Sequence, residues 1–229
     1  MKLLALLCLC VAASASAADN TVRLAGRVSA KPRVAVVTAD SAGAYKARSG
    51  AYAQKFDYDH LKDVVVFAES PEAPVSQYPD AVVTVEAGRY GAKITPEFVP
   101  VAVGQAVVVK NATDAPLVLE AGGDSPAGLS LTVPAKGEQR VVPSRKGLYD
   151  LTCLTCGKEP MQVKILAAGR KVVTAGADGS YALDLPPGSY TVTAWHERLP
   201  ERSETVTLKP GEKHELDFAL SVRDLPQVP

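Results

Sequence analysis

Short valine-rich segments, separated by Gly and Pro at regular intervals, are the feature that most constrains the fold of this chain. Turn residues separate neighbouring segments, as in Val103-Gly-Gln-Ala106 and Pro134-Ala-Lys-Gly137. Valine and other β-branched residues suit a pleated strand. Strands spaced every 8 to 12 residues predict an all-β fold with two packed sheets. The candidate strands before residue 167 are 22–28, 33–38, 63–68, 81–87, 101–103, 106–111, 117–120, 129–133, 138–142, 147–152 and 162–166.

Residues 39–61 are the exception to this pattern. The stretch is rich in Ala, Tyr and Lys and is interrupted by Gly43 and Gly50. Because glycine destabilises a helix interior, we expect a long connection that contains at most one helical turn.

The N-terminal segment, residues 1–17, has the pattern of a secretory signal peptide. Lys2 supplies a positive start, residues 3–13 are apolar, and Ala15-Ser16-Ala17 is a small-residue cleavage site. Eleven apolar residues are too few for a membrane span, which needs roughly 20, and no later run reaches that length. The mature protein is therefore expected to be periplasmic or secreted, where disulfides persist.

The charge balance bears on the class of partner. The chain has 25 Lys and Arg against 25 Asp and Glu, and loss of Lys2 with the signal leaves a net charge of −1. A nearly neutral protein lacks the positive electrostatic field that attracts nucleic acids or anionic membranes. We expect an unidentified protein partner in the cell envelope, no nucleic acid and no transmembrane segment.

A second, smaller unit is expected after residue 167. Asp178-Gly179 and Pro186-Pro-Gly188 are tight-turn signals. Alternation of side chains along this strand predicts that Tyr190 and Trp195 lie on opposite faces of the sheet. A sandwich of residues 168–221 alone would be marginal, so we expect it either to pack on the first domain, residues 18–167, or to borrow a strand such as 22–28. The candidate strands are 171–174, 180–185, 189–196, 204–208 and 213–220, followed by a tail at 222–229.

Cys153 and Cys156 are the only cysteines outside the signal, and Met161 is the only methionine besides the initiator. They lie on a Gly/Pro-containing loop between two candidate strands. A structural disulfide is favoured in an oxidising compartment. Soft-metal binding by two thiolates and a thioether, most naturally of Cu(I), is the second interpretation. A redox-active dithiol is less favoured, because no helix N-terminus is evident to lower a thiol pKa, and free thiols without a role remain a fourth possibility.

Several strings resemble a bacterial exported cupredoxin of the plastocyanin-like group, across roughly residues 60–218. They are Ile94-Thr-Pro-Glu-Phe98, Val103-Gly-Gln-Ala-Val-Val-Val-Lys-Asn111 and Gly147-Leu-Tyr-Asp-Leu-Thr-Cys153. Leu185-Pro-Pro-Gly-Ser-Tyr190 and Trp195-His196 resemble the carboxypeptidase regulatory-like (transthyretin-like) module that often follows. The resemblance implies a Greek-key cupredoxin-like sandwich followed by a small transthyretin/Ig-like sandwich.

In cupredoxins, copper is held by two histidines, a cysteine and a weakly bound methionine. The resemblance places the cysteine at Cys153 and, with longer spacing than usual, the methionine at Met161. The first histidine falls within Leu117-Val-Leu119 and the second at Cys156, so neither imidazole is present. The three histidines of the chain, His60, His196 and His214, lie at other positions in the sequence.

The sequence therefore predicts an exported, non-catalytic binding or assembly protein with a degenerate type 1 copper site and no cofactor. The alternative is a copper-binding or electron-transfer protein that uses Cys153, Cys156 and Met161. A thiol–disulfide enzyme has weaker support. His196-Glu197 suggests acid/base chemistry only weakly, since no nucleophile lies near it in the sequence.

Overall fold

The computed structural model describes residues 21–31, 61–71, 78–89, 91–122, 125, 129–157 and 161–221. The expected signal peptide, the strand expected at 33–38, nearly all of the 39–61 connection, His60 and the 222–229 tail lie outside these residues. The described chain is all-β, as predicted. Its strands are β1 (Val22–Lys31), β2 (Val65–Glu69), β3 (Ala81–Gly88), β4 (Gly91–Thr95), β5 (Phe98–Val101), β6 (Val107–Asn111), β7 (Leu117–Ala121), β8 (Ser130–Val133), β9 (Glu138–Val141), β10 (Gly147–Cys153), β11 (Met161–Ala167), β12 (Lys171–Thr174), β13 (Ser180–Leu185), β14 (Gly188–His196), β15 (Leu199–Leu208), β16 (His214–Glu215) and β17 (Phe218–Ser221).

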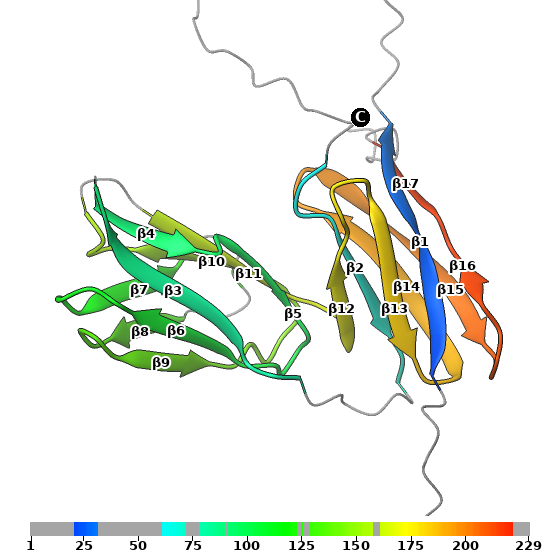
Figure 1. Ribbon diagram of the computed structural model, residues 1–229, viewed down its shortest axis with the longest axis horizontal. Coiled ribbons are helices and arrows are strands. Elements are labelled where there is room, and N and C mark those ends of the chain that lie inside the picture. The colour runs from blue at the N-terminus through cyan, green and yellow to red at the C-terminus, as the bar shows by residue number, and fades with distance from the viewer. Residues whose placement is uncertain are drawn as a thin grey trace, which may run out of the picture.

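The strands form two sandwiches that lie side by side (Figure 1). The first sandwich packs the sheet β5-β11-β10-β7-β8 against the sheet β4-β3-β6-β9. The second packs β12-β2-β14-β15 against a sheet in which β1 pairs with β13, β16 and β17. Among the residues that the structure describes, no helix is long and apolar enough to cross a membrane.

Alternating burial along the strands builds both cores. Along β10, Tyr149, Leu151 and Cys153 are buried, whereas the residues between them are partly exposed. Successive side chains of a strand point to opposite faces of the sheet. The alternation thus places one face of each strand in a core and leaves the other face for solvent or for the neighbouring sandwich.

The first sandwich is inserted into a hairpin of the second. β2 and β12 pair directly and antiparallel, with Ala68 opposite Lys171 and Val65 opposite Thr174. All strands of the first sandwich lie between them in the sequence. The chain leaves the second sandwich at the end of β2 and returns to it at the adjacent strand.

The expected division into domains at 18–167 and 168–221 has to be corrected. β1 pairs with β13 over six residues, from Val22 opposite Leu185 to Arg27 opposite Ser180, and β2 pairs with β14. Both N-terminal strands therefore lie in the second sandwich. Of the two arrangements that the sequence left open for the small unit, packing on the first domain or borrowing residues 22–28, the structure shows the second through the β1–β13 pair, and the unit also contacts the first sandwich.

A small apolar cluster joins the two sandwiches. The rings of Phe98 on β5 and Trp195 on β14 stack with their centroids 6.0 Å apart and their planes at 7°. Trp195 faces this joint while Tyr190 on the same strand lies in the core of the second sandwich, as the alternation predicted. The cluster consists of Val65, Phe67, Leu166 and Ala168, with Phe98, Leu148, Val172 and Trp195 packed against it.

Charged groups border this joint. Lys146, from the first sandwich, lies with its Nζ 4.7 Å from the centroid of the Phe67 ring and 3.3 Å from Glu69 Oε2. Lys164 on β11 pairs with Glu197, which follows β14. Apolar packing and ion pairs therefore act together at this joint.

Several strand assignments differ from the sequence-based expectation. The strand expected at 101–103 is β5, Phe98–Val101, and the strand expected at 204–208 begins at Leu199. The strand expected at 213–220 is divided into β16 and β17, because Asp217 Oδ1 accepts a hydrogen bond from Arg27 N (2.8 Å) at the break. Leu216 O lies so close to Gly26 that a Cβ there would be 1.8 Å from it. β4 was not expected as a strand, and it pairs with β3.

The insertion predicts that the second sandwich folds without the first. In a chain in which residues 70–169 are replaced by Asn-Gly, a two-residue turn would join Glu69 to Arg170 at the point where β2 and β12 already pair. We expect cooperative thermal unfolding and a dispersed amide NMR spectrum. A spectrum typical of an unfolded chain would contradict the insertion.

Candidate functional site

The sulfur-containing loop lies at the end of the first sandwich that is remote from the joint, called here the distal end. Cys153 is the last residue of β10 and pairs with Met161, the first residue of β11. At the other end of the same ladder, Gly147 pairs with Ala167, which leads into β12. Six strand residues at about 3.3 Å each separate the cysteine from the joint by roughly 20 Å.

Cys153 and Cys156 form a disulfide, with their Cα atoms 5.5 Å apart. Both are buried, with 2% and 6% of their surface exposed, whereas Leu154 between them is 55% exposed. The bond thus closes a tight loop whose apolar tip points into solvent.

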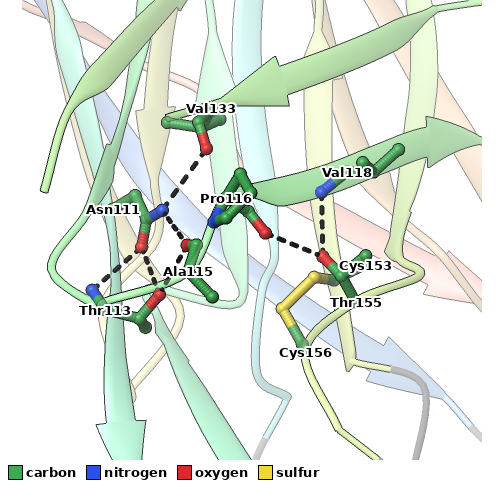
Figure 2. Close-up of a disulfide and its surroundings, with 9 residues drawn as sticks. All are labelled: Asn111, Thr113, Ala115, Pro116, Val118, Val133, Cys153, Thr155 and Cys156. Carbon is green, nitrogen blue, oxygen red and sulfur yellow. Dashed lines mark hydrogen bonds between the residues drawn. A yellow bond between two sulfur atoms is a disulfide. The ribbon is translucent and has the colours of Figure 1, made fainter. Parts of the chain in front are cut away.

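The loop is anchored to the start of β7 (Figure 2). Thr155 Oγ1 accepts a hydrogen bond from Val118 N at 3.0 Å and donates to Pro116 O at 3.4 Å. Leu154 N donates to Val118 O at 2.8 Å. These contacts satisfy the loop backbone, as buried polar groups require, and fix the disulfide against β7.

Asn111 fixes the neighbouring loop of the distal end (Figure 2). It is 2% exposed, and its Nδ2 donates to Ala115 O at 2.8 Å, Pro134 O at 2.9 Å and Val133 O at 3.3 Å. Its Oδ1 accepts from Thr113 N at 2.9 Å and Thr113 Oγ1 at 2.7 Å. Asn111-Ala-Thr113 matches a glycosylation pattern, but the buried and fully bonded amide leaves no room for a glycan.

The residues at the distal end do not fit a type 1 copper centre. Leu117 and Leu119, the positions implied for the first histidine, are apolar and buried. Cys156 stands at the position implied for the second histidine and is bonded to Cys153, so the thiolate that would bind copper is also absent. A blue-copper ion needs two imidazoles and a thiolate, and none of the three is offered here.

The two histidines that the structure describes, His196 and His214, lie in the second sandwich. His196 ends β14 and accepts a hydrogen bond at Nδ1 from Arg198 N at 3.1 Å. Burial lowers the pKa of His196, against the opposing effect of Asp63 and Glu197. His214 lies in β16, opposite Leu24. Among the residues that the structure describes, no three His, Cys, Asp or Glu side chains come together as a metal site.

An open cleft of about 310 Å³ lies beside the disulfide. Gly91 and Gly157 approach closely here, and both have positive φ, 143° and 142°. A Cβ on Gly91 would lie 3.2 Å from Cys156 O, which accepts a hydrogen bond from Ala92 N at 2.9 Å. The described residues that line the cleft are Gly88, Arg89, Gly91, Ala92, Lys93, Cys156, Gly157 and Met161.

The structure therefore brings together the three sulfur-bearing residues that the sequence singled out, as a disulfide and a neighbouring thioether. The sequence interpretation missed the cleft and the role of Asn111 in this loop. Gly91 and Gly157 can be read from the sequence, but no local sequence pattern indicates that two glycines 66 positions apart lie next to each other.

Reduction of the disulfide is expected to lower the free energy of unfolding by about 2 kcal/mol. The bond closes a loop of only four residues, which constrains the unfolded chain little. Urea unfolding with and without reductant measures the difference. The double variant Cys153→Ala, Cys156→Ala is the control and should not respond to reductant, and a loss above about 5 kcal/mol in the natural protein would contradict this account.

Asn111→Ala is expected to destabilise the protein by about 3 kcal/mol, because the buried side-chain amide that bonds three carbonyl groups and Thr113 is lost. Chemical denaturation monitored by circular dichroism provides the measurement. Lys110→Ala, on the exposed face of the same strand, is the matched control and should change stability by less than about 0.5 kcal/mol. Equal effects of the two changes would refute the anchoring role of Asn111.

Comparisons with known proteins found two kinds of similarity, and these are the two that the sequence resembles. Residues 159–221 match the carboxypeptidase regulatory-like domain, which includes β11–β17 but not β1 or β2. A search of curated proteins found no match.

The similar solved structures include cupredoxins. A purple cupredoxin from Nitrosopumilus maritimus has 15% identity and a TM-score of 0.33, and the alignment covers 39% of this chain and all of that one. Amicyanin in a reduced Cu(I) form has 18% identity and a TM-score of 0.31, with 47% of this chain and all of amicyanin covered. An oxidised amicyanin has 21% identity, a TM-score of 0.31 and the same coverage. At these values the description of the fold depends on the strand pairing itself. It gives one inserted sandwich, which includes β11 of the matched regulatory-like segment, and a second sandwich, which contains the rest of that segment, β12–β17.

Proposed function

We propose that this is an exported, non-catalytic binding or assembly protein of the bacterial cell envelope, with a degenerate type 1 copper site. The observation that supports this most directly is the replacement of copper ligands at the distal end. Leu117 and Leu119 lie where the resemblance implies one imidazole, and Cys156 stands in place of the second. The disulfide between Cys153 and Cys156 leaves no thiolate. The cupredoxin-like scaffold is thereby kept while its electron-transfer chemistry is lost.

A non-catalytic role is supported by the titratable groups. Strongly shifted pKa values mark catalytic sites when the groups converge in a cleft. Here the Arg140 hydrogen bond lowers the pKa of Asp80, on the surface of the first sandwich. Burial raises the pKa of Tyr181, whose hydroxyl donates to Leu216 O at 2.6 Å in the second sandwich. These shifts accompany separate structural contacts.

Binding at the distal end is supported by its exposure and rigidity. Leu154 is the most exposed large apolar side chain among the described residues, and the disulfide fixes its backbone. An apolar side chain on a rigid loop loses little entropy when a partner covers it. A disulfide also fits a periplasmic or secreted location.

The alternative is a copper-binding or electron-transfer protein that uses Cys153, Cys156 and Met161. One observation favours it over other metal proposals: Cys156 and Met161 line the same cleft. This alternative requires that the disulfide first be reduced, since a disulfide offers no thiolate.

The proposal is tested with a photo-crosslinking amino acid at position 154, in protein expressed in its own compartment. We expect a discrete cross-linked species of defined mass, identified by mass spectrometry. The matched control position is Val142, an exposed apolar side chain that follows β9 on the joint side of the sandwich. Equal cross-linking at both positions, or none at 154, would count against a binding role of the distal end.

A further inference from the structure

We propose that the joint between the two sandwiches is pH-sensitive. Protonation of His196 at Nδ1 rearranges the turn between β14 and β15, and this loosens the stack of Trp195 on Phe98. The mechanism belongs to the joint and does not depend on the binding role of the distal end.

His196 lies between two residues that contact the first sandwich. It is the last residue of β14 and is 8% exposed. Trp195, before it, stacks on Phe98 of β5. Glu197, after it, pairs with Lys164 of β11. A change in the backbone at His196 therefore reaches both contacts.

The imidazole of His196 fixes the turn in its neutral form. The backbone N–H of Arg198 donates to Nδ1 of His196 at 3.1 Å. Because a backbone N–H can only donate, Nδ1 must carry its lone pair, and the ring proton lies on Nε2. The bond spans two residues, like the bond by which an Asn or Asp side chain closes a turn. It closes the connection between His196 and Leu199, where β15 begins.

The strand pairing is irregular at the same place. The register of β14 against β15 shifts between Ala194 and His196, so Trp195 lies at a bulge. A bulge leaves one residue unpaired and disrupts the ladder locally. The Arg198 bond therefore holds a turn that the ladder supports less than it supports the rest of the hairpin.

A proton on Nδ1 is incompatible with this turn. The Nδ1–H would face the Arg198 N–H, and both groups would be donors. The imidazolium would also carry its charge in a buried position, where ions are poorly solvated. Opening of the turn relieves both effects, because the ring then reaches water. It also carries Glu197 away from Lys164 and disturbs the neighbouring Trp195.

The groups around the ring set the direction of the pH dependence. Burial lowers the pKa of His196; Asp63, Glu197 and a hydrogen bond with the backbone of Lys62 oppose this, and Arg198 lowers the pKa further. The pKa in the closed joint thus lies below the ordinary value of about 6.5. The closed joint binds fewer protons than the open one, so it is favoured at neutral pH and lost as the pH falls below about 6.5.

The fluorescence of Trp195 tests the proposal, because it is the only tryptophan of the chain. The mature protein is titrated from about pH 7.5 to about pH 4.5 around the ordinary histidine pKa, and histidine protonation is followed by NMR. We expect a red shift of the emission with a midpoint below about 6.5, coincident with protonation of His196, and an unchanged far-UV circular dichroism spectrum. Simultaneous loss of the circular dichroism signal, or protonation of His196 without a change in emission, would overturn the proposal.

His196→Asn removes the titration but keeps the turn. The Asn side-chain oxygen can accept from the N–H two residues on and does not titrate, so the emission should stay at its neutral-pH position throughout. His214→Asn, in β16 of the same sandwich, is the matched control and should keep the transition and its midpoint. An unaltered transition in His196→Asn would overturn the assignment to His196.

Phe98→Leu tests the coupling from the other sandwich. It weakens the stack without changing a charge, and linkage is reciprocal, so a less stable closed joint should make protonation of His196 easier. The midpoint of His196 protonation measured by NMR should rise by about half a pH unit. An unchanged midpoint would show that the imidazole titrates independently of the joint, and the proposal would fail.

Discussion

The antiparallel pairing of β2 with β12 is the constraint on which the arrangement of the molecule depends. It holds the two points where the chain enters and leaves the first sandwich at neighbouring positions of one sheet, with Ala68 opposite Lys171. Arg170 N donates to Ala68 O at 2.9 Å, which extends this contact to the joint itself. Because both connections are fixed there, the ladder of β10 and β11 projects the disulfide away from the second sandwich.

Local patterns in the sequence were sufficient for most strands but not for their partners. Valine alternation and glycine turns located β3, β6, β10 and β13 within a few residues. The sandwich to which β1 and β2 belong was not predictable, since their neighbours β13 and β14 lie more than a hundred residues away along the chain. Strand pairing over such distances is decided by the match of whole faces, which a single strand does not reveal.

In the candidate site, too, residue types could be predicted from the sequence but spatial neighbours could not. The resemblance to cupredoxins placed Leu117, Leu119 and Cys156 where histidines would be expected, and residue type alone decides whether an imidazole is present. The cleft was not evident, because it depends on the approach of Gly91 to Gly157 across two sheets. Residue type thus decides which ligands the loop can offer, while only the three-dimensional arrangement shows that Met161 shares a cleft with Cys156.

The position of the insertion also sets an order of events during synthesis. β2, with Val65, Val66 and Phe67, leaves the ribosome before residues 70–170 and long before its partners β12 and β14. The first sandwich has all its strands available while β2 is still unpaired. Non-local strand pairing is slow to form, and an apolar strand that waits for its partner is open to pairing with another chain. Completion of β14 therefore ends the interval in which a nascent chain is most prone to aggregate.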